Sequence, residues 1–301
     1  MNPEAAPAPK NFSTGPAGGQ GWTIKRILDW AADYFNKQNI ENPHLEAEIL
    51  LAHALNLKRI DLYVKFEKEL DQNELSRFKE CVIRRKNHEP TAYITGIKSF
   101  MSLDLIVSRL VLIPRPETEL LVEAAIDIAK HIEHPSILDI GTGSGAIAVS
   151  LAKYVKHSRI IATDISRGVT LIALENAKKH GVMDSITFEV ADLFPKEAEK
   201  FDLIVSNPPY IRSGDIKDLA PEIRDFEPHV AYDGGPDGLD HYRKILDKAG
   251  EFIKPNGYLL FEVGEGQAKE VVNLIRSAFA SAEIVTKKDL NGIERVIIAK
   301  S

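Results

Sequence analysis

The sequence predicts an α/β fold in which a largely parallel sheet follows a small helical bundle. Short apolar runs at 136–140, 160–163, 186–190 and 201–206 have the length and composition of buried strands, and helix-like patterns alternate with strands along this part of the chain. Such alternation favours a parallel sheet with helices on both faces. Glycine-rich or polar segments follow these runs, so we expect a binding site where the carboxyl ends of the strands meet.

The first 21 residues differ in composition from the rest of the chain. They are rich in Pro, Ala and Gly and show no hydrophobic periodicity, which predicts a disordered tail over 1–21. The tail lacks the apolar core of a signal peptide and the arginines of a mitochondrial presequence. It contains the tripeptide Gly18-Gly19-Gln20.

Residues 22–90 are predicted to form a helical bundle. Thr23 is a residue type that favours the N-cap position, and Trp22 and Ile27 have the spacing of a hydrophobic staple around it. Asn42-Pro43 is typical of a cap followed by proline at the first helical position. The bundle therefore begins at Thr23, with a second helix after Asn42.

A third helix of the bundle is predicted to follow Asp71. Asp71 and Glu74 have the spacing of a capping box. The apolar positions of this helix are Leu75, Phe78, Val82 and Ile83. The single cysteine, Cys81, falls in the same pattern and is interpreted as a small core residue. The bundle is expected to end near Glu89-Pro90.

Between 91 and 113 the pattern changes to the alternation typical of strands, which predicts a hairpin-like connector. The alternating apolar positions are Phe100, Leu103, Leu105 and Val107. The connector leads to Arg115 and Glu117, which we consider as site candidates, although Pro116 also has the position of the first residue of a helix over 117–132.

The glycine-rich loop at 141–145 follows the strand 136–140. Its residues are Gly141, Thr142, Gly143, Ser144 and Gly145. Glycines allow the backbone to approach a ligand closely and can expose amide groups at a helix N-terminus. Asp164 ends the next strand, where a carboxylate can accept both ribose hydroxyls of a nucleoside. Asp192 follows the third strand and could reach an adenine amino group beside apolar side chains.

Asn207, Pro208, Pro209 and Tyr210 follow the strand 201–206 and are the best indication of chemistry. The Asn207 carbonyl can accept a hydrogen bond from an NH₂ group, and the two prolines restrict the backbone so that the Pro208 carbonyl also faces outward. Tyr210 offers a flat face to a planar group. The tetrapeptide therefore predicts a site for a planar amide or an aminopurine, whose nitrogen it would align for reaction.

The glycine loop alone leaves two enzyme classes open. Gly141, Gly143 and Ala146 also satisfy the dinucleotide pattern G-x-G-x-x-A, which is found in nicotinamide enzymes. Hydride transfer does not require the tetrapeptide at 207–210, whereas methyl transfer to an amide-like nitrogen does. The combination of the two segments favours a methyltransferase.

Four segments of the chain resemble the release factor glutamine N5-methyltransferases, the PrmC/HemK family. They are 114–119 (PRPETE), 139–145 (DIGTGSG), 207–210 (NPPY) and 226–243 (FEPHVAYDGGPDGLDHYR). The resemblance runs from about Thr23 to Lys300 in family order. Tyr232 departs from it, because the family usually has Leu at this position.

The resemblance implies a class I S-adenosylmethionine-dependent methyltransferase domain over 114–301. Such a domain has a Rossmann-like, seven-stranded, mostly parallel sheet with one antiparallel strand near its end. The implied donor is S-adenosylmethionine, which leaves as S-adenosylhomocysteine. The implied acceptor is the glutamine of the Gly-Gly-Gln motif in class 1 peptide chain release factors. The bundle over 22–90 is expected to help hold that protein; the alternative is that it only braces the catalytic domain.

The resemblance also suggests a role for each candidate. The donor is expected against the glycine loop, with its ribose on Asp164 and its adenine between Ile165 and Leu193 and near Asp192. The two hydrogens of the substrate amide would point to the carbonyls of Asn207 and Pro208, and Tyr210 would limit the plane of the amide. Asn207 is also assigned to the donor site, Arg115 and Glu117 are expected beside it, and no metal is expected.

Bulk properties agree with a cytoplasmic enzyme, and a monomer is expected. A chain of 301 residues with 44% hydrophobic residues can form one large and one small core. One cysteine excludes an internal disulfide and suits a reducing compartment. The net charge of −6 argues against a nonspecific nucleic-acid binder, and neither DNA nor a membrane is an expected partner.

A basic cluster, Arg84-Arg85-Lys86, leaves two interpretations open. It is either the solvated end of a helix or a contact to an acidic partner or RNA. Two other functions also stay open. An adenine-N6 DNA methyltransferase uses a similar tetrapeptide on a flipped base, and a noncatalytic nucleoside-binding regulator would need the glycine loop alone.

Overall fold

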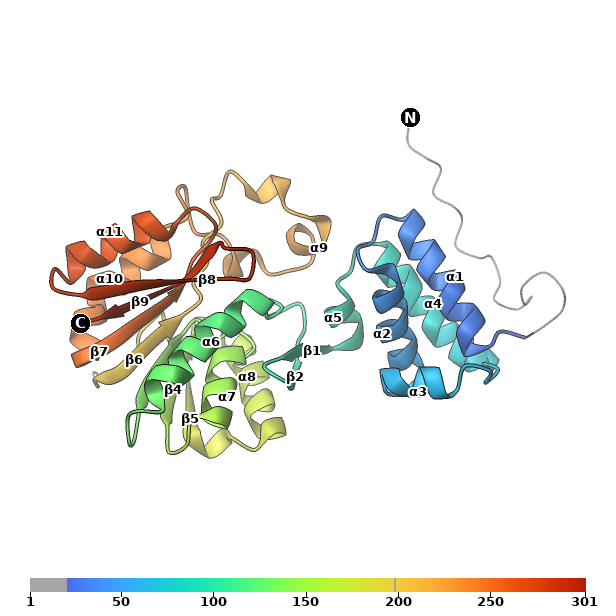
Figure 1. Cartoon of the computed structure of the whole chain (residues 1–301), viewed down its shortest axis with the longest axis horizontal. Helices are drawn as coiled ribbons and strands as arrows, with labels where there is room; N and C mark the ends of the chain where they lie inside the picture. Colours follow the sequence, from blue (N-terminus) through green and yellow to red (C-terminus); the bar gives the residue numbers. More distant parts are fainter. Residues whose placement is uncertain (1–20, 198) are drawn as a thin grey trace. The chain divides into compact units, whose positions relative to one another are not determined.

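A computed structural model describes residues 21–197 and 199–301 of the chain (Figure 1). These residues divide into two compact units, one that ends at Gly96 and one that begins at Ile97. Apart from Gly21, the predicted disordered tail with Gly18-Gly19-Gln20 lies outside the described residues.

The first unit consists of helices. They are α1 (Ile24–Lys37), α2 (Pro43–Leu55), α3 (Arg59–Val64), α4 (Gln72–Lys86) and α5 (Thr91–Thr95). The cap predictions for α1 and α4 are confirmed, because the Thr23 hydroxyl accepts a hydrogen bond from the Arg26 N–H, and Asp71 and Glu74 form a reciprocal capping box. Asn42 is the N-cap of α2, but its side chain makes no capping hydrogen bond. The short helices α3 and α5 were not predicted.

One hydrophobic core holds the first unit together. It includes Phe35, Leu51, Phe78 and Cys81, and Trp22 packs against its edge. The prediction that Cys81 is a core residue is therefore confirmed. Ile83 lies outside this core, since 38% of its surface is exposed on the opposite side of α4. None of the helices in the described part of the chain is long and apolar enough to span a membrane.

The basic cluster at the end of α4 is largely neutralised within its own unit. Arg84 forms a two-point ion pair with Glu89, and the buried Arg85 donates to the carboxylate of Glu46 at 2.6 Å. These pairs argue against a contact of Arg84 and Arg85 to an outside acidic partner or RNA, and Arg85 is buried instead of solvated.

The predicted connector contains a hairpin, but only over part of its length. β1 (Ile97–Phe100) and β2 (Leu103–Ile106) pair antiparallel, whereas residues 91–95, predicted as part of the hairpin, form α5. The buried Asn176 fixes β2, since its side chain bonds both the N–H and the carbonyl of Ile106. The same amide donates to the Ser144 carbonyl, so one side chain joins the hairpin to the glycine loop.

The second unit contains a seven-stranded sheet in the order β5-β4-β3-β6-β7-β9-β8. Its strands are β3 (Ser136–Ile140), β4 (Arg159–Asp164), β5 (Ile186–Val190), β6 (Phe201–Ser206), β7 (Ile253–Glu262), β8 (Glu283–Lys288) and β9 (Glu294–Lys300). β9 runs antiparallel to both neighbours, and the remaining pairs are parallel. This confirms the predicted sheet with a single antiparallel strand near its end.

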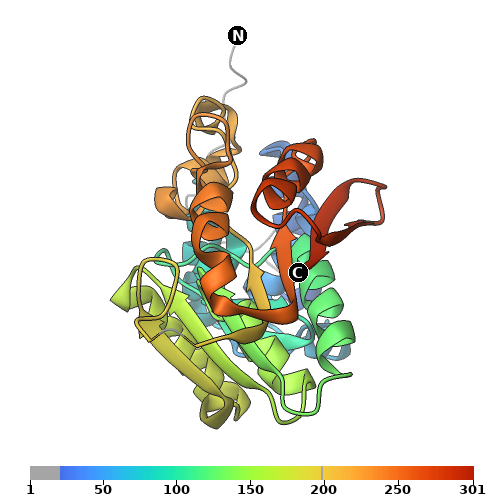
Figure 2. The same cartoon turned by 90° about the vertical axis from the view of Figure 1, so that its left-hand side faces the viewer.

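Helices cover both faces of this sheet (Figures 1 and 2). α6 (Pro116–Ala129), α7 (Ala146–Tyr154) and α8 (Arg167–His180) pack with the hairpin on one core, and α10 (Asp240–Phe252) and α11 (Ala268–Ala278) pack on the other. The short α9 (Pro221–Arg224) lies in the segment between β6 and α10. α6 starts at Pro116, at the first helical position, and ends three residues before the predicted Ile132.

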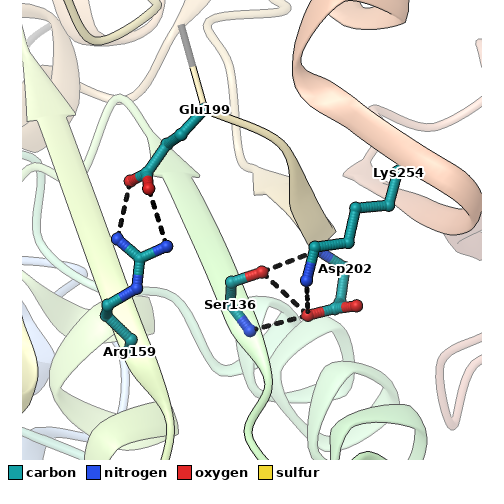
Figure 3. A network of polar contacts seen from close by, with 5 residues as sticks. All are labelled: Ser136, Arg159, Glu199, Asp202 and Lys254. Atoms are coloured by element: carbon teal, nitrogen blue, oxygen red, sulfur yellow. Dashed lines mark hydrogen bonds and ion pairs between the residues drawn. The ribbon is translucent and has the colours of Figure 1, made fainter. Parts of the chain in front are cut away.

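A polar network joins the amino ends of the parallel strands, at the edge opposite the predicted site (Figure 3). The Asp202 carboxylate in β6 accepts hydrogen bonds from the N–H and hydroxyl of Ser136 in β3 and from the Lys254 ammonium in β7, at 2.7–2.9 Å. Burial would raise the pKa of Asp202, but these donors outweigh it and hold the pKa below its usual value. Arg159 and Glu199 form a more exposed pair nearby.

We predict that Asp202→Ala lowers the free energy of unfolding by about 1–3 kcal/mol at neutral pH, because it leaves the Ser136 donors and Lys254 without their acceptor. The folded-state pKa of Asp202 is depressed, so its contribution is present above the unfolded-state pKa and is lost as the pH falls through the folded-state pKa. Denaturant titrations at several pH values measure this. Arg159→Ala, which breaks the exposed pair, is the control and should change stability by about 0–1 kcal/mol; equal losses in both variants would contradict the assignment.

Candidate active site

The glycine loop forms the first part of the site, at the carboxyl end of β3. Gly141, Gly143 and Gly145 all have positive φ values, of 74°, 56° and 81°. A Cβ atom on Gly145 would lie 3.1 Å from the Ala173 Cβ, so this glycine allows α8 to pack closely against the loop. A Cβ on Gly141 would meet no described heavy atom within 4 Å. The loop therefore combines a tightly packed end with an open surface at its start.

The expectation that the loop offers free amide groups is wrong at four positions. The N–H groups of Gly141 and Thr142 donate to the Thr163 carbonyl, and that of Gly145 donates to the Thr142 carbonyl. The Gly143 N–H donates to the Asp164 carboxylate at 3.1 Å. The loop uses these amides to hold its own shape, and it contributes an open surface instead of free donors.

Asp164 lies at the end of β4, beside the loop. One of its carboxylate oxygens accepts from Gly143 and the other from the Ser166 N–H at 3.0 Å. Burial raises its pKa, and these N–H donors oppose the rise. Each oxygen has a second lone pair, so the group can still accept further hydrogen bonds. Asp164 thus fixes the loop and presents an acceptor at the same edge.

The residues predicted around an adenine lie on neighbouring strand ends. Ile165 follows β4 and has 68% of its surface exposed, while Asp192 and Leu193 follow β5. Leu193 has a φ of 69°, which is unusual for a leucine and costs about 1–3 kcal/mol. The Thr163 hydroxyl donates to the Leu193 carbonyl at 2.6 Å and stabilises this conformation. The strained turn keeps Leu193 half-buried beside β4.

The tetrapeptide at 207–210 lines a cavity of about 120 Å³ at the carboxyl end of β6. The cavity residues are Leu112, Arg115, Asn207, Pro208, Pro209, Tyr210, Ile211, Ile223, Ala231 and Tyr232. Arg115 is thus brought to the tetrapeptide, but Glu117 does not line this cavity. The Arg115 guanidinium pairs with the buried Glu227 carboxylate, which also accepts from the Ile113 N–H. Glu227 therefore holds Arg115 at the cavity wall.

The Asn207 side chain has a defined orientation. Its Nδ2 donates to the Thr118 hydroxyl oxygen at 3.1 Å, from the first turn of α6. Because the NH₂ end is bonded to Thr118, the carbonyl oxygen Oδ1 is the end that remains for a ligand. The site therefore presents Asn207 as an acceptor.

Tyr210 is held at both its hydroxyl and its main chain. Its hydroxyl donates to the carboxyl group of Glu262, the last residue of β7, at 3.3 Å. Its carbonyl accepts from the Gln267 side-chain amide at 2.9 Å, and the other end of that amide accepts from the Gly264 N–H. Burial raises the pKa of Tyr210, and the nearby Glu262 raises it further. The phenol therefore stays neutral.

The glycines of the 232–238 segment allow it to lie directly against the tetrapeptide. Ile211 and Asp233 form a parallel bridge, and the Gly234 N–H donates to the Ile211 carbonyl at 2.8 Å. A Cβ on Gly234 would lie 2.8 Å from the Pro209 carbonyl oxygen, and one on Gly238 would lie 2.4 Å from the Tyr210 carbonyl oxygen. Larger residues at these positions would displace the tetrapeptide.

Sequence reasoning did not identify Thr118, Glu227, Glu262 and Gln267 as parts of the site. One signal could have found Glu262, because it ends an apolar strand in the same way as Asp164 does. Thr118, Glu227 and Gln267 lie on a helix or on loops, and only the tertiary structure brings them to the tetrapeptide.

Two family models match the chain. The model described as "PrmC N-terminal domain" matches residues 26–96, and the model described as "Methyltransferase small domain" matches residues 116–223. Among solved structures, the chain is similar to the hMettl16 catalytic domain in complex with the MAT2A 3′UTR hairpin 6. The TM-score is 0.53 and the identity 14%, over 75% of this chain and 81% of the other. That similarity concerns the fold alone.

Curated relatives are considerably closer in sequence. A release factor glutamine methyltransferase of Geobacter sulfurreducens is 44% identical over 277 residues, which cover 92% of this chain and 96% of the relative. One of Rhodopirellula baltica is 39% identical over 282 residues, covering 92% and 95%. With matches of this extent, and with the class I methyltransferase fold described above, the chain belongs to the release factor glutamine methyltransferase family.

Proposed function

We propose that this enzyme transfers a methyl group from S-adenosylmethionine to the side-chain amide nitrogen N5 of glutamine in the Gly-Gly-Gln motif of class 1 peptide chain release factors. The observation that carries the proposal is the orientation of Asn207. Its NH₂ group is bonded to Thr118, so its carbonyl is presented at the wall of a small cavity. An acceptor in this position suits a ligand that carries an NH₂ group.

The tetrapeptide accounts for the reaction of a poor nucleophile. The nitrogen lone pair of an amide is delocalised into the carbonyl group. Hydrogen bonds from the amide NH₂ to the carbonyls of Asn207 and Pro208 would localise this lone pair and direct it, while Tyr210 limits the plane of the amide. No strong base is required, because the alkylated nitrogen is acidic and can lose its proton to water. The residues act mainly through alignment, for which effective molarities of about 10⁵–10⁸ M are known.

The residues at the ends of β3, β4 and β5 fit a nucleoside-containing donor. The open surface at Gly141 leaves room for a ligand against the backbone, and the Asp164 carboxylate beside it has acceptor capacity for ribose hydroxyls. Leu193, Ile165 and Asp192 offer apolar walls and a carboxylate for an adenine. When bound, S-adenosylmethionine supplies an electrophilic methyl group on its sulfonium sulfur.

The helical unit, 21–96, would contribute to binding of the release factor. Its short helix α3 carries Ile60, Tyr63 and Val64, which are 65%, 45% and 78% exposed. Adjacent exposed apolar side chains are typical of a protein-binding surface. Release factors as substrates and the single cysteine support a cytoplasmic location.

We predict that Asn207→Ala reduces methyl transfer by roughly 10²- to 10³-fold, the scale for one preorganised hydrogen-bonding group, with donor affinity nearly intact. Asn207→Asp keeps an acceptor but adds a charge near the sulfonium, and should change donor affinity as well. Turnover is measured with labelled donor on release factor, on its variant with Ala in place of the Gly-Gly-Gln glutamine, and on adenine-containing DNA.

The matched control is Asn273→Ala, which removes the same side chain from an exposed position of α11. It should keep wild-type turnover. Methylation of the DNA would favour the adenine-N6 alternative, no methylation at all would favour the nucleoside-binding regulator, and normal turnover by Asn207→Ala would contradict the role of the tetrapeptide.

Asp164→Ala is expected to weaken donor binding by roughly 10- to 100-fold, because it removes charged acceptors from the ribose and from the loop amide of Gly143. Calorimetry with S-adenosylmethionine measures this. Asp127→Ala, an exposed change on α6, is the control and should bind the donor normally. Unchanged affinity in Asp164→Ala would remove Asp164 from the donor site.

For the helical unit, the double change Ile60→Ser and Val64→Ser should raise KM for the release factor without lowering kcat. The two side chains are exposed, so the substitutions leave the core of the unit intact. The comparison is turnover of the whole release factor against turnover of a short Gly-Gly-Gln peptide. A KM effect on the factor but not on the peptide is expected; equal KM values for variant and wild type on the factor would exclude α3 from the contact.

A further inference from the structure

Glu262 is a buried carboxyl group that the mechanism above does not use. It ends β7, and the pairing of Ser206 with Phe261 places it level with Asn207, the first residue after β6. Only 1% of its surface is exposed. A carboxyl group buried to this extent is costly unless it is paired or has a function.

Glu262 bonds the last side chain of the tetrapeptide, Tyr210, and lies near Thr118, which holds the first, Asn207. Its Oε1 accepts from the Tyr210 hydroxyl at 3.3 Å, and its main-chain carbonyl accepts from the Tyr242 hydroxyl at 2.7 Å. Its Oε2 has no hydrogen-bond partner among the described residues, and the nearby Thr118 hydroxyl lowers its pKa. Thr118 is the residue that holds the Asn207 amide.

The direction of these hydrogen bonds determines which end of the Asn207 amide faces the cavity. The Thr118 oxygen accepts from Asn207, so its own O–H is available to donate toward Glu262. An ionised carboxylate can only accept, and it therefore orients the hydroxyls of both Thr118 and Tyr210 as donors. With Thr118 in that orientation, its lone pairs face Asn207, and the Asn207 carbonyl must face the cavity. Such bonds are often long before substrate binds and shorten afterwards.

We propose that Glu262 is a positioning residue of the amide site, whose ionised carboxylate is the shared acceptor that orients Thr118 and Tyr210 and, through Thr118, the Asn207 amide. This inference rests on the proposed function and extends it to a residue outside the tetrapeptide. In its protonated form the same group would be a donor and could no longer orient both hydroxyls.

The charges around Glu262 place its ionisation near neutral pH. Burial raises its pKa to about 7, the hydroxyls of Thr118 and Tyr210 oppose the rise, Glu117 on α6 adds to it, and Arg295 on β9 opposes it. Arg295 is itself paired with Asp289 at 3.0 Å. The Tyr242 phenol on α10 stays neutral, because burial raises its pKa. The orienting form of Glu262 therefore increases as the pH rises through about 7.

The same ionisation should reduce stability. The folded-state pKa of Glu262 lies above its usual 4.5, so its contribution to stability is present below the unfolded-state pKa and is lost as the pH rises through about 7. Glu262→Gln cannot ionise, and its thermal stability relative to wild type should improve as the pH rises through this range. The ionised form of Glu262, which orients the two hydroxyls, is therefore the form in which the folded protein is less stable.

The test compares wild type with Glu262→Gln in kcat, KM and donor affinity, from about pH 5.5 to 9. Wild-type kcat should rise as the pH passes about 7. Glu262→Gln should lower kcat by up to about tenfold and should not show this inflection. Its donor affinity and its KM for release factor should change by less than about threefold. Glu48→Gln is the matched control, since Glu48 is a buried carboxyl that accepts from a tyrosine hydroxyl, that of Tyr63, in the other unit. It should keep the inflection.

Two further variants keep the inference testable if Glu262→Gln does not fold. Thr118→Val replaces a hydroxyl with a methyl group and Tyr210→Phe removes a hydroxyl. Both should lower kcat, while Thr118→Ser, which keeps the hydroxyl, should retain it. An inflection that persists in Glu262→Gln with wild-type kcat, or normal kcat in both Thr118→Val and Tyr210→Phe, would overturn the proposal.

An infrared titration separates this inference from the proposed function. Burial raises the pKa of Asp139 to about 7 as well, so the Glu262 signal is the part of the protonated-carboxyl band that disappears near pH 7 in wild type and is lost in Glu262→Gln. Its detection would identify the ionisation of Glu262 without turnover. Its absence, in a wild type that methylates release factor, would contradict the inference alone. A wild type that shows the band but methylates no release factor would contradict the proposed function and the positioning role with it.

Discussion

The parallel pairing of β3 with β6 is the constraint on which the site depends. Ile140 lies opposite Ser206, and the Ser206 hydroxyl donates to the Ile140 carbonyl at 2.8 Å. The glycine loop begins immediately after one of these residues, and Asn207 follows the other. Because paired strands lie about 4.8 Å apart, the segment expected to hold the donor and the segment expected to hold the amide start side by side. A shift of one residue in this register would move the glycine loop away from Asn207, and with it the expected donor site away from the expected amide site.

Acidic groups behave differently at the two ends of the sheet. At the amino ends, Asp202 has several donors and a depressed pKa, which stabilises the fold (Figure 3). At the carboxyl ends, burial raises the pKa of Asp139 and of Glu262 to about 7, and also raises that of Asp164. Groups with raised pKa values reduce stability once they ionise, and they gather where ligands are expected. Ionised carboxylates such as Asp202 therefore stabilise the fold at the amino ends of the strands, whereas the buried carboxyl groups at the carboxyl ends destabilise it when they ionise.

Backbone conformation contributes to the same edge. The positive φ values of the glycine loop and of Leu193, and the close contacts that Gly234 and Gly238 make with the tetrapeptide, all lie at or beside the carboxyl ends of the strands. Asn176 joins the glycine loop to the hairpin through one amide. The loops at this edge are therefore held by main-chain hydrogen bonds and by packing.

The sequence by itself determined the strands, their order along the chain, the capped helices and the segments that carry the site, because apolar periodicity, capping residues, glycines and prolines act over a few neighbouring residues. It could not determine that α5 replaces the start of the hairpin, nor that the loop amides of Gly141 and Gly143 are used internally, since these depend on contacts with distant segments. Only the tertiary structure decided which side chains orient the tetrapeptide. Thr118 and Glu262 are far from Asn207 in sequence, and a helix start and a strand end must meet before hydrogen bonds can connect them.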